Sequence, residues 1–134
     1  MGYGDNAKAA LITRGSVEIG RLGIRMGGKP ETFFGLTGIG DLIVTCASMH
    51  SRNRRAGILL GQGYTMKEAM KEVNMVVEGV YSAKAAMALA RKYDTELPII
   101  EQVNQILFEG KDPKKVVADL MLRDKKTENS LIPW

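Results

Sequence analysis

Apolar residues recur along most of the chain at the three- and four-residue steps of an amphipathic helix. Residues 30–48 hold one or two shorter apolar segments that are interrupted by glycines. No run of alternating apolar and polar residues predicts a strand, so the expected fold class is all-α. Helices are predicted over about residues 6–26, 52–61, 65–73 and 78–93, with two more after Pro98 and Pro113.

Capping residues mark where several of these helices begin and end. Ser51 precedes the segment 52–61, and Thr65 with Glu68 forms a capping box for a short helix that ends near Val73. Glycine ends a helix readily, and proline is tolerated in a first turn. The other expected boundary residues are Asp5, Pro98, Gly110, Asp112 and Pro113.

The apolar faces of these helices define an expected core. Four charged residues of the first helix, Arg14, Glu18, Arg21 and Arg25, recur on another face, which indicates a solvated and partly ion-paired stripe. The core is predicted to include Leu11, Ile12, Ile19, Ile99, Val103, Ile106, Val117 and Leu120.

The composition is that of one ordinary soluble domain, with 134 residues of which 45% are hydrophobic and 25% charged. The chain turns polar after residue 123, so we expect a helical domain over residues 1–123 and a polar tail over 124–134. No apolar run approaches the roughly 20 residues of a membrane span, and the first residues lack the pattern of a signal peptide. Cys46 is the only cysteine, so no internal disulfide can form and a cytoplasmic protein is expected. We also expect no membrane partner.

The net charge of +4 leaves an anionic partner open. The aromatic residues are scattered and form no stacking platform for single strands, so we expect no nucleic-acid partner. Two alternatives remain at this point. One is a basic helical nucleic-acid-binding module that uses Arg52, Arg54 and Arg55, and the other is a dimerisation module without a site.

Those three arginines crowd the expected first turn of a helix, in the segment Ser51-Arg52-Asn53-Arg54-Arg55. The helix dipole is positive there and disfavours cations, so a bound anion would reverse the sign of the interaction. Backbone N–H groups, a serine hydroxyl and arginine side chains together make a phosphate site. The alternative is a solvated basic run, or arginines paired with acids elsewhere.

Two carboxylates are further candidates. Asp41 has apolar neighbours on both sides, which predicts partial burial and polar partners, and Thr45 follows four residues later on the same helical face. Glu78 opens the alanine-rich segment, where an acid suits the helix dipole. Each has a plain structural alternative, an N-cap for Asp41 and a favourable first-turn position for Glu78.

Three other features carry less weight. The segment from Gly2 to Ala7 matches the dinucleotide fingerprint, but no strand precedes it, so a loop before a helix is the better interpretation. His50 is the only histidine and has no second ligand beside it, so a loop histidine is favoured and no metal site is expected. Cys46 has no nearby base and is interpreted as a packed thiol.

The motifs become more specific when their order and spacing are considered together. They are Gly4-Asp5-Asn6-Ala7-Lys8-Ala9-Ala10, Gly38-Ile39-Gly40-Asp41-Leu42, Thr45-Cys46, Ser51-Arg52-Asn53-Arg54, Gly61-Gln62-Gly63 and Val76-Val77-Glu78-Gly79. In this order they resemble bacterial NAD(P)-dependent glycerol-3-phosphate dehydrogenase, from about Gly2 to Arg123.

The resemblance implies the C-terminal half of a two-domain oxidoreductase, with the helical fold of 6-phosphogluconate dehydrogenase-like enzymes. The intact enzyme would interconvert sn-glycerol 3-phosphate and dihydroxyacetone phosphate and supply glycerol 3-phosphate for phospholipid synthesis. The Rossmann domain that holds most of the NAD or NADP, and the proton-transferring lysine, are expected upstream of these residues. The chain alone is therefore expected to be inactive, and a homodimer is implied.

The resemblance also implies roles for particular residues. No catalytic residue is expected within the chain, and Lys8 belongs to a motif other than that of the missing lysine. Substrate binding is implied for Asp41, Thr45, Ser51, Arg52 and Asn53, and cofactor contact for Arg52, Val76 and Glu78.

Overall fold

A computed structural model describes residues 2–74 and 77–123, and over these residues the regular structure is entirely helical. No strand occurs within these ranges, so the predicted all-α class is confirmed. The elements are α1 (Asp5–Arg25), α2 (Pro30–Phe33), the π-helical turn η1 (Leu36–Gly40), α3 (Asp41–Ala47), α4 (Arg52–Gly61), α5 (Met66–Val73), α6 (Glu78–Lys92), α7 (Pro98–Glu109) and α8 (Pro113–Leu122).

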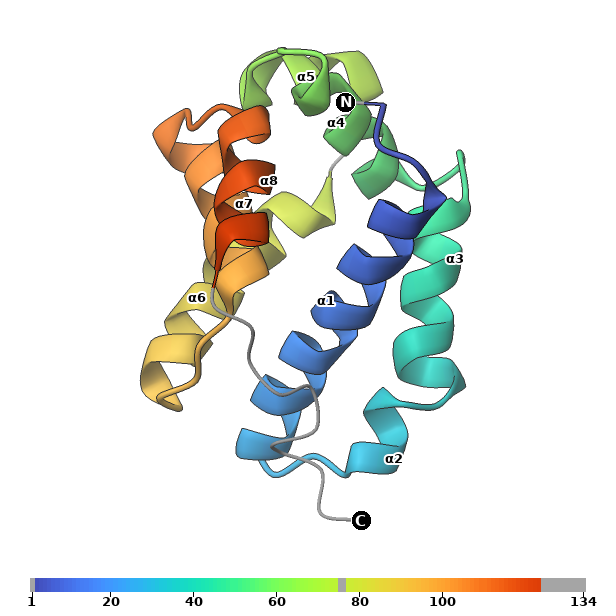
Figure 1. Cartoon of the computed structure of the whole chain (residues 1–134), viewed down its shortest axis with the longest axis vertical. Helices are drawn as coiled ribbons and strands as arrows, with labels where there is room; N and C mark the ends of the chain where they lie inside the picture. Colours follow the sequence, from blue (N-terminus) through green and yellow to red (C-terminus); the bar gives the residue numbers. More distant parts are fainter. Residues whose placement is uncertain (1, 75–76, 124–134) are drawn as a thin grey trace.

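Helix α1 runs between two groups of helices (Figure 1). It contacts α2 and α3 on one side and α7 on the other. Helix α4 contacts α3 of one group and α6 and α8 of the other, and it also contacts α5. Within the described ranges no single helix is long and apolar enough to cross a membrane, although the bent pair Pro30–Ala47 and Arg52–Gly61 meets that criterion when taken together.

Two small apolar clusters form the core. The larger one joins α4, α5, α6 and α7, and the smaller one joins α1 to the turn between α6 and α7. Alanines contribute to both, because a small side chain lets two helices approach closely. The buried members are Ala56, Val73, Val77, Val80, Ala83 and Leu107 in the larger cluster, and Leu22, Ala90 and Leu97 in the smaller.

The predicted core residues were mostly wrong. Leu11, Ile19 and Val103 are 52%, 39% and 38% exposed, and the other five are only half-buried. The apolar pattern identifies the hydrophobic face of a helix, but it does not say which parts of that face a neighbouring helix covers. Among the described residues, alanines of α4, α5 and α6 are buried, whereas Leu11 and Ile19 of α1 stay exposed.

Glu18 departs from the predicted solvated stripe, because its side chain is only 5% exposed. Its carboxylate accepts hydrogen bonds from the backbone N–H of Ile99, at 2.8 and 3.0 Å, and from that of Ile100 at 3.3 Å. Leu97, at the N-cap position of α7, provides no side-chain cap. Glu18 therefore caps α7 from α1, and burial raises its pKa above the usual range although these hydrogen bonds oppose the shift.

Two of the predicted helix caps are confirmed and a third is corrected. The Thr65–Glu68 capping box is confirmed, with the Glu68 N–H donating to Thr65 Oγ1 at 3.3 Å and the Thr65 N–H donating to Glu68 Oε2 at 2.8 Å. Asp112 caps α8 by accepting from the Lys114 N–H at 2.9 Å. Asp5, however, is the first residue of α1 and not its N-cap, a position that Gly4 occupies without a side-chain cap.

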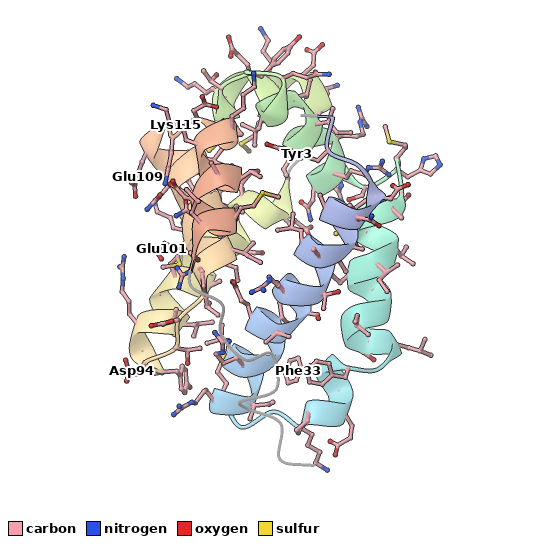
Figure 2. The ribbon with its side chains drawn as sticks, viewed as in Figure 1. Tyr3, Phe33, Asp94, Glu101, Glu109 and Lys115 are labelled. Carbon is pink, nitrogen blue, oxygen red and sulfur yellow. The ribbon has the colours of Figure 1, made fainter. Side chains whose placement is uncertain are left out.

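Phe33 holds the short elements α2 and η1 against α1 (Figure 2). Its ring lies over Gly23 of α1, where a Cβ atom would overlap the ring. A Cβ atom at Gly38 would likewise overlap the backbone carbonyl of Phe33, so a side chain at position 38 would displace η1. These contacts place the start of α3, and with it Asp41, beside α1.

Candidate functional site

A cavity of about 330 Å³ lies where the N-terminal end of α4 meets α3 and the start of α6. Five of its lining residues were predicted as site residues from the sequence. The lining consists of Val44, Thr45, Ser48, His50, Ser51, Arg52, Asn53 and Glu78.

The start of α4 supplies the positive side of this cavity. Ser51 is the N-cap, and its hydroxyl accepts a hydrogen bond from the Arg54 N–H at 3.2 Å. No acidic residue lies in the first turn of α4. Among the three arginines, only Arg52 lines the cavity, because Arg54 donates to the carbonyl of Ala47 and Arg55 is exposed. The structure thereby separates three arginines that are equivalent in the sequence pattern.

Asn53 connects the cavity to the start of α6. Its Oδ1 accepts a hydrogen bond from the backbone N–H of Gly79 at 3.1 Å, across 26 positions of sequence. This contact holds the first turn of α6 against the first turn of α4. Glu78, the first residue of α6, thus lies in the same cavity lining as Arg52.

Asp41 lines a second cavity of about 300 Å³. Thr45 lines both cavities, so the two are neighbours. Asp41 is exposed, which corrects the expectation of partial burial. The N-cap alternative does not hold either, because η1 runs directly into α3 and Asp41 is already a helical residue. The remaining lining residues are Ile19, Thr32, Phe33, Thr37, Gly38 and Leu42.

The sequence-based prediction omitted Val44, Ser48 and His50 from the site. His50 is exposed as expected for a loop histidine, yet it lines the first cavity, and its backbone N–H donates to Ser48 Oγ at 3.1 Å. Its position directly before Ser51 was the available indication of this placement. The predicted cofactor residue Val76 lies outside the described residues.

The charges around the first cavity favour an oxyanion over a metal ion. Arg52 and Ser51 line this cavity at the start of α4, and arginine side chains, hydroxyls and first-turn N–H groups are donors of the kind that phosphate oxygens accept from in proteins. No three histidine, cysteine, aspartate or glutamate side chains in residues 2–74 and 77–123 could hold a metal ion. Burial raises the pKa of the Cys46 thiol although Lys8 and Arg54 oppose the shift, so Cys46 is a poor source of thiolate.

Two of the residues that the sequence predicts to contact a nicotinamide cofactor, Arg52 and Glu78, line the first cavity. Gly2 to Gly4 run directly into α1, and Gly4 is the N-cap of that helix.

A family model for the C-terminus of NAD-dependent glycerol-3-phosphate dehydrogenase matches residues 1–118. The chain belongs to this family. It is 69% identical over 134 residues to the NAD(P)+ glycerol-3-phosphate dehydrogenase of Agathobacter rectalis, covering 100% of this chain and 40% of that protein. It is 70% identical over 128 residues to the enzyme of the same name from Fusobacterium nucleatum, covering 96% of this chain and 38% of that protein.

The similarity extends to a solved structure of the glycerol-3-phosphate dehydrogenase family. The chain superimposes on a crystal structure of glycerol-3-phosphate dehydrogenase from Coxiella burnetii with a TM-score of 0.87 and 48% sequence identity. The match covers 90% of this chain and 37% of that one. The chain thus spans about two fifths of the length of these relatives, and the resemblance seen in the motifs is confirmed at the level of the family.

Proposed function

We propose that the chain is the substrate-binding, C-terminal part of an oxidoreductase that interconverts sn-glycerol 3-phosphate and dihydroxyacetone phosphate with NAD or NADP. The observation that carries this proposal is the placement of Arg52 in a cavity at the N-terminal end of α4, in a chain of this family. When bound, the cofactor supplies hydride transfer at C2 of the substrate. The residues of this chain bind and orient the phosphate ester.

The phosphate occupies the first cavity in this proposal. Arg52 and the Ser51 hydroxyl line that cavity, and the first-turn N–H groups of α4 contribute the positive end of the helix dipole. An anion there offsets the unfavourable placement of a cation in a first helical turn. The same arrangement disfavours a cationic ligand.

The glycerol part of the substrate extends toward the second cavity. Thr45 lines both cavities and Asp41 lines the second, so together they offer a hydroxyl and a carboxylate to the hydroxyl groups of the substrate. Glu78 lies on the α6 side of the first cavity, where it and Val76 are proposed to contact the cofactor. Asn53 is proposed to contact the substrate next to Arg52.

The remaining length of the relatives would supply the rest of the enzyme. We place there the Rossmann domain and the proton-transferring lysine, and we take residues 1–123 as the helical domain with 124–134 as its tail. The chain alone is then inactive toward dihydroxyacetone phosphate. A cytoplasmic role in supplying glycerol 3-phosphate to phospholipid synthesis agrees with this activity.

A homodimer is proposed as the assembly. Exposed apolar side chains outside the first cavity support an interface, since Leu36 and Leu122 are 92% and 84% exposed. A nucleic-acid partner is not favoured, because Arg54 is engaged with the Ala47 carbonyl and Arg52 lines a cavity, so the arginines do not form one outward basic face. Sedimentation of the chain tests the dimer.

Titration with glycerol 3-phosphate and inorganic phosphate, followed by amide shifts in NMR, tests the phosphate site. Only part of the full site is present, so we expect a Kd on the order of 1 mM, or about 4 kcal/mol. Arg52→Ala should weaken binding roughly tenfold, a loss of about 1.4 kcal/mol. Arg55→Ala removes the same charge from the same helix but does not line the cavity, so it should have little effect. Equal loss in both variants, or shifts away from residues 50–55, would contradict the assignment.

A further inference from the structure

The contact between Asn53 and Gly79 lies at the junction of the two helices that form the first cavity. Gly79 lies within α6 and its φ is not positive, so its lack of a side chain matters for approach and not for backbone conformation. A Cβ atom at position 79 would lie 2.8 Å from Asn53 Oδ1 and 3.0 Å from Asn53 Cγ. The first separation is shorter than real Cβ contacts and the second is tighter than most of them, so a side chain at position 79 would shift the carboxamide.

The Gly79 N–H also determines which way the carboxamide points. An asparagine side chain offers one accepting oxygen and one donating NH₂ group of nearly equal size. Because the Gly79 N–H is a donor, it selects the orientation in which Oδ1 faces α6. The NH₂ group is then the part of Asn53 that remains for a ligand in the cavity. In the reverse orientation the Asn53 NH₂ group would face the Gly79 N–H, so two donors would meet. The Asn53 oxygen, an acceptor, would then face the anion in the cavity.

We propose that Gly79 is a positioning residue that locks the Asn53 carboxamide with its NH₂ group available to an oxyanion. The lock makes the cavity selective for a ligand whose oxygens accept hydrogen bonds, such as a phosphate monoester, and it holds the Glu78 side of the site at a fixed distance from the Arg52 side. This inference rests on the proposed function, because it assumes that the cavity binds the phosphate group.

The first test compares Gly79→Ala with Gly57→Ala. Alanine is a better helix former than glycine at both positions, so a purely local view predicts unchanged phosphate binding in both variants. A Cβ atom at Gly57, on α4, meets no atom within 4 Å, whereas one at Gly79 meets Asn53. We expect Gly79→Ala to raise the Kd for glycerol 3-phosphate and inorganic phosphate roughly tenfold, as for the loss of a hydrogen bond to a charged group. Gly57→Ala should leave the Kd unchanged.

A double-mutant cycle shows whether Gly79 acts through Asn53. In the lock mechanism, Asn53→Ala weakens phosphate binding, and adding Gly79→Ala to it causes no further loss. An additional tenfold loss in the double variant would overturn the inference. So would an unchanged Kd in the Gly79→Ala variant of a chain that binds phosphate in its natural sequence. Absence of saturable shifts in the unsubstituted chain would instead overturn the phosphate site itself, and the inference with it.

Asn53→Asp keeps the test decisive if Gly79→Ala does not fold. The aspartate still accepts from the Gly79 N–H, so the amide resonance of residue 79 should stay near its original position, but the NH₂ donor is lost. Phosphate binding should weaken more than in Arg55→Gln, which changes the net charge by the same amount on the same helix. Equal phosphate affinity in these two variants would overturn the inference.

Discussion

Two helix N-termini in this chain differ in what faces their backbone N–H groups. At α7 the chain supplies the charge itself, because the Glu18 carboxylate of α1 accepts from the N–H groups of Ile99 and Ile100. At α4 no acid lies in the first turn, and Arg52 lines an open cavity. The first arrangement joins two helices. The second places the positive end of a helix at a cavity, which is the arrangement that suits an anionic ligand.

The two arrangements differ in which interaction is unfavourable. At α7 the carboxylate is desolvated, and its hydrogen bonds to the helix offset that cost. At α4 a cation stands at the positive end of a helix dipole, which is unfavourable by up to about 1 kcal/mol, and a bound anion would relieve it. A substitution at Glu18 should therefore change stability, whereas one at Arg52 should change ligand affinity.

The largest expected effect is the loss of the internal anion. Glu18→Ala removes the acceptor of buried N–H groups at α7, which should lower the free energy of unfolding by about 3 kcal/mol. Glu109→Ala provides a matched control, since it removes the same charge at the opposite, exposed end of α7 (Figure 2). Urea unfolding of both variants measures the difference. A Glu18→Ala loss no larger than that of Glu109→Ala would show that the cap contributes nothing.

The sequence identified features whose partners are near in the chain and missed those whose partners are distant. Ser51 and Thr65 were recognised as caps because each bonds a backbone N–H three residues later. Glu18 was assigned to a solvated stripe because its partner Ile99 is 81 residues away. No pattern along one helix carries that information.

The candidate site shows the same limit. The sequence indicated that the start of α4 is basic, but only the fold distinguishes Arg52, which lines the cavity, from Arg54, which bonds the Ala47 carbonyl. The contact between Asn53 and Gly79 was likewise not predicted, since it depends on how α4 packs against α6. Motif order identified the family, whereas the geometry of the site required the tertiary structure.

A smaller effect is expected when the N-cap of α4, which faces the cavity, is compared with the N-cap of α8, which does not. Ser51→Ala and Asp112→Ala each remove an N-cap acceptor, from α4 and α8, so each should lower the free energy of unfolding by about 1 kcal/mol. Only Ser51 lines the cavity, so only Ser51→Ala should also weaken phosphate binding. Thermal unfolding and NMR titration provide the two measurements. Equal loss of phosphate affinity in both variants would remove the distinction between these helix starts.

The smallest effect concerns the pH dependence of stability. Burial raises the pKa of Glu18 above the 4.5 of an ordinary glutamate, although hydrogen bonds from α7 and the charges of Arg21 and Arg123 oppose the shift. The folded chain therefore keeps a proton on Glu18 over a pH interval, starting near 4.5, in which the unfolded chain has released it. Because the folded state binds more protons there, the Glu18 contribution to the free energy of unfolding falls as the pH rises through this interval.

Glu68 supplies a control of opposite sign within the same chain. Hydrogen bonds from the backbone and side chain of Thr65 lower the Glu68 pKa below 4.5, so its contribution is present above that pH and is lost as the pH falls through the lowered value. Urea unfolding from pH 3 to 7 should show the difference between the natural chain and Glu18→Gln decreasing with rising pH. The corresponding difference for Glu68→Gln should increase. If the Glu18→Gln difference also increased with pH, the internal anion would be stabilised by its hydrogen bonds more than burial disfavours it, and the two helix N-termini would differ in geometry but not in the sign of their electrostatics.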